Sequence, residues 1–226
     1  MKYLRKFNTS AEKSNWSASE EYVKPNVCLT EGAIDYNVPA LIMGVSIQHI
    51  DGSCYTTEQW TAAGFSNEQA NGVAVVTDSA KFVISKTELS ENKWSSDTQN
   101  EIVGVLVASS GVTAPSDFAG ENNTALIVNT DTSGAAYMCA NYEFPNGSKG
   151  YLPASGEWVA VYQNGSDIRA AMSLIGGQAI SFVVNVYYWS STQRASDKAW
   201  QHCLADNSIY SESKSKSRKV RPFTSL

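Results

Sequence analysis

The residue types that most often carry catalysis or bind metals are few and widely spaced in this chain. They are four cysteines and two histidines: Cys28, Cys54, Cys139, Cys203, His49 and His202. No CxxC pair occurs, and these residues do not reproduce the ligand spacing of an ordinary zinc site. The GxSxG, Walker and dinucleotide-binding glycine patterns are absent from the sequence too. We therefore expect no metal, no cofactor and no catalytic site, and a Cys28–Cys54 disulfide is allowed but not required.

Side chains suited to recognition gather instead near the C-terminus, within residues 187–223. Alternation along a strand predicts that Trp200 and Leu204 point inward with His202, whereas Gln201 and Cys203 point outward. A turn is expected at residues 206–207. The apolar residues that we expect to be buried here are Trp189, Trp200, Leu204, Ile209, Val220 and Phe223. Fixed aromatic side chains would then hold a polar outer surface that is free to vary.

The polar residues of this segment predict a contact surface over residues 188–216. They carry charges of both signs and several hydrogen-bonding groups, and Tyr210 and Arg194 are its expected anchors. The whole predicted set is Tyr188, Gln193, Arg194, Ser196, Asp197, Lys198, Gln201, Cys203, Asp206, Ser208, Tyr210, Glu212, Ser213 and Lys214. An ordinary polar sheet without a ligand is the alternative.

The elements that must position this segment alternate between strands and helices. Strands are expected in 40–52, 72–86 and 101–110, and again from 179 onward, because these stretches are rich in Val and Ile and bounded by turn residues. Helices are expected in 56–65, 118–129 and 132–144, with two more in 151–177. Thr56 or Thr57, Ser155 and Ser166 would cap three of them, and Gly176-Gly177 would end the last. Strands, then helices, then strands predict an α+β domain.

Size and charge limit the classes of function. The 226 residues suffice for one large domain, and the net charge of −5 gives no electrostatic footprint for nucleic acid. No apolar run approaches the roughly 20 residues of a membrane-spanning helix, and the N-terminus lacks the apolar region of a signal peptide. Residues 1–40 are polar and irregular, which indicates an arm or assembly segment ahead of a domain over 41–226.

Three motifs, GYLPASGEW (150–158), YYWSST (187–192) and RKVRPF (218–223), carry a family resemblance. Over roughly residues 40–226 the chain resembles the C-type-lectin-fold proteins of gut bacteria and their phages. These include the major paralogous domain proteins and the variable proteins of diversity-generating retroelements. The resemblance implies small mixed sheets, two to four short helices and a C-terminal β-hairpin region.

For function, the resemblance implies a ligand-binding, adhesin-like protein on a phage tail or a bacterial cell surface. Its ligand would be a protein or glycan of a cell surface, and trimers are expected by family analogy alone. FPN at 144–146 lacks the acidic residue of a calcium-dependent sugar site, so calcium is not expected. Two alternatives remain: a virion or fimbrial subunit without a ligand, and an oxidase similar to formylglycine-generating enzymes that would pair Cys139 with Cys203.

Overall fold

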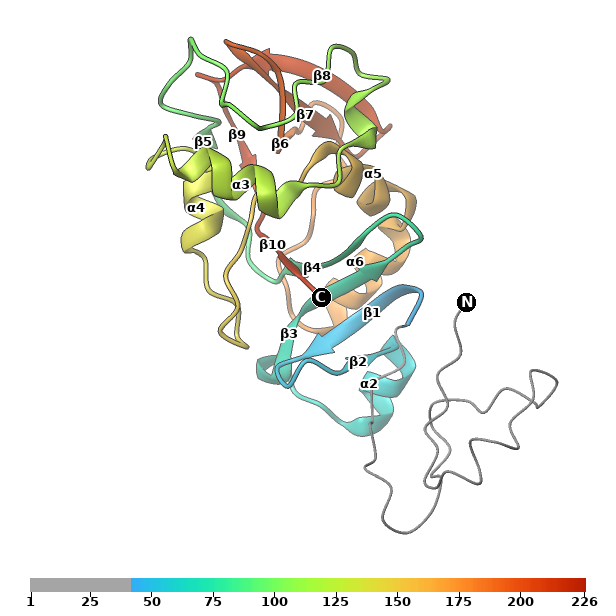
Figure 1. Cartoon of the computed structure of the whole chain (residues 1–226). Helices are drawn as coiled ribbons and strands as arrows, with labels where there is room; N and C mark the ends of the chain where they lie inside the picture. Colours follow the sequence, from blue (N-terminus) through green and yellow to red (C-terminus); the bar gives the residue numbers. More distant parts are fainter. Residues whose placement is uncertain (1–41) are drawn as a thin grey trace, which may run out of the picture. The chain divides into compact units, whose positions relative to one another are not determined.

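The computed structural model describes residues 42–226 (Figure 1). The predicted arm, residues 1–40, and Cys28 lie outside the described residues. Within 42–226 the chain forms two five-stranded sheets and five α-helices, which confirms the α+β class. The residue patterns predicted five helices, which the structure contains, whereas the family resemblance implied two to four. No helix in this part of the chain combines the length and apolar character needed to cross a bilayer.

The first sheet has the strand order β10-β4-β3-β1-β2, with all neighbours antiparallel. Its strands are β1 (Gly44–His49), β2 (Cys54–Tyr55), β3 (Ala70–Val76), β4 (Lys81–Ser85) and β10 (Phe223–Ser225). Every residue of the central strand β3 is buried, because both faces of the sheet are covered. Gly72 allows β3 and β4 to approach closely, since a Cβ there would lie 2.3 Å from the carbonyl oxygen of Ile84.

The second sheet has the order β5-β9-β6-β7-β8 and is mixed, because β6 and β9 run parallel. Its strands are β5 (Leu89–Lys93), β6 (Tyr188–Ala195), β7 (Lys198–Cys203), β8 (Ser208–Ser213) and β9 (Ser217–Val220). The β7–β8 hairpin matches the predicted C-terminal hairpin, and its turn includes Asp206 and Asn207. Bulges interrupt β6 between Trp189 and Ala195.

The last ten residues join the two sheets, because β9 belongs to the second sheet and β10 to the first (Figure 1). Phe223 exchanges backbone hydrogen bonds with Tyr151 and stacks on Phe82 with ring centroids 4.7 Å apart. The buried residues predicted for this end of the chain include Val220 and Phe223, and both are fully buried.

Helices α3 to α6 lie between β5 and β6 in the sequence, and α2 lies between β2 and β3. They are α2 (Thr57–Ala63), α3 (Gly120–Val128), α4 (Ala135–Asn141), α5 (Ser155–Gln163) and α6 (Gly165–Leu174), with 3₁₀ turns at Asn67–Gln69 and Ala114–Ser116. Thr56 caps α2 as predicted, and Gly176 adopts a left-handed conformation after α6. The predicted caps Ser155 and Ser166 are wrong, because the N-cap positions are Ala154 and Asn164.

One predicted strand is absent from the structure, and another begins later than expected. Residues 101–110 form turns, and Val103 in this stretch is 90% exposed. The chain there bends at Gly104, which has a positive φ of 88°, and only Val107 makes an isolated bridge, to Gln193. Residues 179–187 form a loop, so the strand that was expected from 179 begins at Tyr188.

Candidate recognition surface

The second sheet buries residues that the sequence placed on its surface. Gln201 is 4% exposed and Cys203 is 2% exposed, so their predicted outward exposure is wrong. Strand β7 lies between β6 and β8, and segments from elsewhere in the chain cover both of its faces. Trp200 and Leu204 are buried as predicted, whereas Ile209 is only half-buried against Trp200.

Five of the fourteen predicted contact residues are buried and cannot meet a ligand in this structure. They are Tyr188, Gln193, Gln201, Cys203 and Lys214. The ring of Tyr188 packs on Trp158, with centroids 4.7 Å apart, and its hydroxyl donates to Glu88 at 2.7 Å. The side-chain amide of Gln193 accepts from the backbone N–H of Ile102 at 2.8 Å and donates to the carbonyl of the same residue at 2.9 Å. These side chains hold distant segments against the sheet.

Lys214 was expected beside Tyr210 and Glu212 on the outer face, but it is fully buried. Strand β8 ends at Ser213, and the lysine then turns beneath the loop over residues 97–105. Its ammonium donates to the carbonyl of Asn100 at 2.8 Å and to Gln193 Oε1 at 2.9 Å, and it lies 4.7 Å from the ring centroid of Trp94. This environment makes Lys214 a structural residue.

The remaining predicted residues do not form one surface. Ser196, Asp197 and Lys198 lie at the β6–β7 turn, with Ser213 opposite Lys198 on β8. Asp206 and Ser208 lie at the β7–β8 turn, where the carboxylate accepts from the backbone N–H and hydroxyl of Ser208.

The two expected anchors, Arg194 and Tyr210, lie on opposite faces of the sheet. The guanidinium of Arg194 lies 5.9 Å from the ring of Trp200. Gln201 follows Trp200 in β7, so their side chains point to opposite faces of the sheet. Tyr210 is the cross-strand partner of Gln201 and therefore lies on the face opposite Trp200. The prediction that they share one surface is therefore wrong.

The structure assembles a different group on the Tyr210 side of the sheet, which we call the tyrosine face: Tyr187, Tyr210, Glu212 and Arg218. The two tyrosine rings meet edge to face, with centroids 5.9 Å apart, and Arg218 lies 5.6 Å from the centroid of Tyr187. Arg218 Nη2 donates to Glu212 Oε2 at 3.0 Å, and its Nε donates to the buried Gln201. Tyr210 is 51% exposed, so an aromatic ring stands in solvent above a fixed ion pair.

Two valines extend the apolar part of this surface. Val183 and Val184 are both exposed, and the carbonyl of Val183 accepts from the thiol of Cys203. Cys203 lies two residues after Gln201 in β7, so both point to the same face of the sheet. Tyrosine and arginine beside apolar side chains are the residue types most enriched where proteins recognise partners. Tyr210 and Glu212 belong to the predicted contact set, whereas Tyr187 and Arg218 do not. The pair Tyr187-Tyr188 could have indicated an exposed tyrosine, because only one of two neighbouring side chains in an extended segment can face the core.

A serine–histidine pair also occurs, but it is enclosed. His202 Nε2 lies 2.8 Å from Ser155 Oγ, and both residues are buried, with no carboxylate bonded to the ring. Burial lowers the pKa of His202 to about 3, so the ring is neutral near pH 7. Nδ1 has no hydrogen-bond partner within the part of the chain that the structure describes. A substrate cannot reach this serine in the structure, so the pair supports packing rather than nucleophilic chemistry.

Cys139 and Cys203, the pair considered for a reactive site, lie in different surroundings. Cys139 is buried on the core side of α4, where burial raises the pKa of its thiol well above the usual value. Cys203 lies in β7 and donates to Val183, in a different environment. Among residues 42–226 there is no group of three or more His, Cys, Asp or Glu side chains that could hold a metal ion.

No protein-family model and no curated protein matches the chain. Among solved structures, the chain is similar to a fimbrial protein from Bacteroides ovatus, with a TM-score of 0.58 and 16% identity. The match covers 82% of this chain and 49% of that protein, so the chain spans about half its length. At this identity the likeness shows a shared fold.

Proposed function

We propose that this protein is an adhesin-like subunit of a bacterial surface appendage and that it contacts its partner through the tyrosine face. The fold likeness to a fimbrial protein supports an appendage of the cell surface better than a phage tail. The observation that carries the contact surface is the exposed ring of Tyr210 beside Tyr187 and the Arg218–Glu212 ion pair. These side chains stand on a sheet whose core is packed, so recognition would not require the backbone to reorganise.

Rigid aromatic side chains suit such a contact. A tyrosine offers a large amphipathic area and loses little conformational entropy on binding, because it has only two side-chain torsions. Arg218 is already held by Glu212, Gln201 and Tyr187, which reduces the entropy lost when a partner covers it. The exposed Val183 and Val184 add apolar area beside it. The partner that fits best is a protein surface, either a host protein or another subunit of the appendage.

The experiment compares two substitutions on the same sheet. The full chain is immobilised and screened for binding to intact bacterial and epithelial cells, and Tyr210→Ala is compared with Arg194→Ala, which alters the opposite face. We expect Tyr210→Ala to weaken binding at least about tenfold, as for a central interface tyrosine, and Arg194→Ala to leave it unchanged. Thermal unfolding of both variants verifies that the fold is retained.

The structural-subunit alternative gives a different pattern. If no cell type binds the chain, self-association is measured by sedimentation at increasing concentration. Loss of self-association in Tyr210→Ala alone would assign the tyrosine face to a contact between subunits. Equal behaviour of both variants in both assays would reject the tyrosine face as a contact surface.

A further inference from the structure

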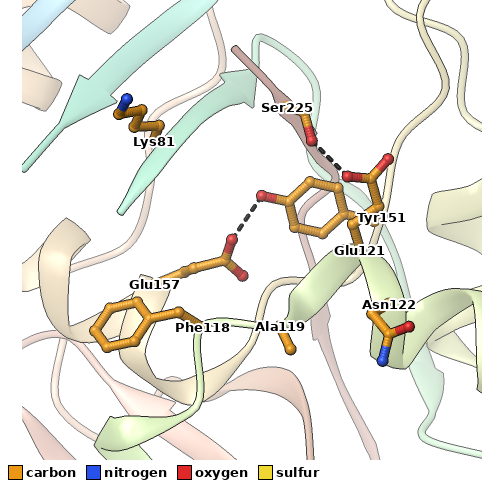
Figure 2. Close-up of a pocket in the computed structure, with 8 residues that line it drawn as sticks. All are labelled: Lys81, Phe118, Ala119, Glu121, Asn122, Tyr151, Glu157 and Ser225. Atoms are coloured by element: carbon orange, nitrogen blue, oxygen red, sulfur yellow. Dashed lines mark hydrogen bonds between the residues drawn. The ribbon is translucent and has the colours of Figure 1, made fainter. Parts of the chain in front are cut away.

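A hollow of about 260 Å³ lies away from the tyrosine face, between the first turns of α3 and α5 and the edge of the first sheet. Figure 2 shows Glu157 and Tyr151 joined by a hydrogen bond, with Phe118 beside Glu157, Lys81 across from it, and Asn122 on α3. At roughly 30 Å³ per water molecule, this volume corresponds to about nine waters. It is therefore large enough for one small organic ring.

Two glycines set the shape of this hollow. A Cβ on Gly120 would lie 2.3 Å from Glu157 Oε2, and a Cβ on Gly156 would lie 2.7 Å from the ring of Phe118. Both distances are too short for any residue with a side chain. The loop before α3 can therefore sit directly against the start of α5, which brings Phe118 and Glu157 to the same small space.

The carboxylates of the hollow are held in fixed orientations. Glu157 accepts from the hydroxyl of Tyr151 at 2.6 Å and from the backbone N–H of Ala154 at 2.7 Å, and its side chain is buried. Glu121 accepts from the hydroxyl of Ser225 at 2.6 Å (Figure 2). Glu157, which is buried and held by two hydrogen bonds, therefore needs little reorganisation when a ligand donor approaches, whereas Glu121 is exposed and held by one.

The donors of the hollow are uncommitted. Within residues 42–226, the ammonium of Lys81 and the amide of Asn122 make no side-chain hydrogen bond and no ion pair. Phe118 is 38% exposed, so part of its ring faces solvent. The hollow thus combines fixed acceptors, free donors and one accessible aromatic ring.

This combination selects among ligand chemistries. The hollow offers acceptors on Glu121 and Glu157 and donors on Lys81 and Asn122, so a ligand group that only donates or only accepts would leave part of this lining unpaired. A neutral ligand with several hydroxyl groups matches the whole lining, because each hydroxyl can donate to a carboxylate and accept from the ammonium or amide. The apolar C–H face of a sugar ring would cover the exposed part of Phe118. We infer that this hollow is a binding site for a neutral polyhydroxylated ligand the size of one sugar ring.

The protonation of Glu157 agrees with this chemistry. Burial, with Asp117 and Glu121 nearby, raises the pKa of Glu157 to about 7, although Tyr151 and Ala154 oppose the shift by hydrogen bonding. Near neutral pH its carboxyl group is therefore divided between an acceptor-only form and a form that can also donate. A hydroxyl group can bond with either form.

The experiment titrates free sugars into the full chain and follows backbone amide resonances by NMR. The panel is glucose, galactose, mannose and N-acetylglucosamine, with butylammonium and acetate as charged probes. We expect saturable shifts at Phe118, Asn122 and Lys81 with at least one sugar. Phe118→Ala and Asn122→Ala should each weaken that binding roughly five- to tenfold, as expected for loss of one contact. Tyr137→Ala, on the surface of α4, is the control and should bind as the parent does.

Three outcomes would overturn this inference. They are the absence of saturable shifts with every sugar, saturable binding of butylammonium or acetate at the hollow in place of sugars, and sugar shifts confined to Tyr187 and Tyr210. The tyrosine face shares no residue with the hollow, so cell binding by the parent and by Phe118→Ala tests the proposed function separately. Loss of sugar binding with unchanged cell binding would separate the two sites.

Discussion

Arg218 of β9 and Glu212 of β8 form an ion pair of 3.0 Å although β6 and β7 lie between their strands in the sheet. The guanidinium crosses the face of the sheet, donates to Gln201 on β7 and lies over the ring of Tyr187. One side chain thus connects segments from three parts of the C-terminal region. Arg218 also covers Gln201. This explains why Gln201 is buried although alternation along β7 places it on the outer face.

We expect Arg218→Ala to lower the free energy of unfolding more than Glu212→Gln does. The arginine variant leaves the buried Gln201 Oε1 without its donor, which costs about 1–3 kcal/mol. The glutamate variant removes a partly exposed ion pair, worth about 0–1 kcal/mol. Urea denaturation of both variants measures the difference, and equal losses would show that the contact to Gln201 contributes nothing.

Lys214→Met should destabilise the chain by about 1–3 kcal/mol, because the carbonyl of Asn100 loses its donor and Gln193 loses one of its partners. The effect should be local as well as global. Hydrogen exchange at the amide of Ile102, which donates to Gln193, is expected to accelerate in the variant. Lys198→Met, at an exposed position of the same hairpin, is the matched control and should change neither quantity. If the Ile102 amide of Lys214→Met exchanged as slowly as in the parent, Lys214 would not hold the loop at Ile102 in place.

Glu157 should make the protein less stable as the pH rises from about 4.5 to about 7. The folded-state pKa is about 7 and the unfolded value is 4.5, so between them the folded chain retains a proton that the unfolded chain has released. Stability is therefore highest below pH 4.5 and falls until the folded carboxyl also ionises. The loss is on the order of 3 kcal/mol. We measure the free energy of unfolding across this pH range for the parent and for Glu157→Gln. The decrease should be present in the parent and absent from the variant, and the same pH profile in both would contradict the raised pKa.

His202 should act in the opposite direction. Its folded-state pKa is about 3, whereas the unfolded value is 6.5, so below pH 6.5 only the unfolded chain takes up this proton. Stability should fall as the pH drops from 6.5 towards 3, by an amount on the order of 5 kcal/mol for this group. NMR titration of the ring measures the pKa directly, and a transition near pH 6.5 in the folded state would refute the prediction. Comparing His202→Gln with Glu157→Gln separates the two opposing contributions.

Local patterns in the sequence predicted many of the elements correctly. Thr56 and the residues after it form the expected capped helix, and Gly176 ends α6 as a left-handed cap. Both features depend on residues within a few positions of each other, so a single stretch of sequence contains the whole cause. The bulky residues of the C-terminal segment, such as Trp189 and Trp200, were likewise predicted to be buried, and they are.

The apolar stretch 101–110 shows where local patterns fail. Its valines indicated a core strand, but Gly104 bends the chain and Gln193, about ninety residues away, binds its backbone. A strand needs a neighbour along its length, and this stretch bridges another strand at one residue only, Val107 to Gln193. The sequence of the stretch alone does not reveal this.

The sequence by itself determined the α+β class, the helix ends at Thr56 and Gly176, and most of the large apolar residues that had to be buried. Only the tertiary structure decided which polar residues are exposed. Alternation along β7 distinguishes two faces, but Arg218 and the loop at Val183 cover the face that was expected to meet solvent. Coverage depends on side chains that arrive from distant segments, and periodicity within one strand contains no information about them. For that reason the proposed contact surface keeps Tyr210, loses Arg194 and Lys214, and gains Tyr187 and Arg218.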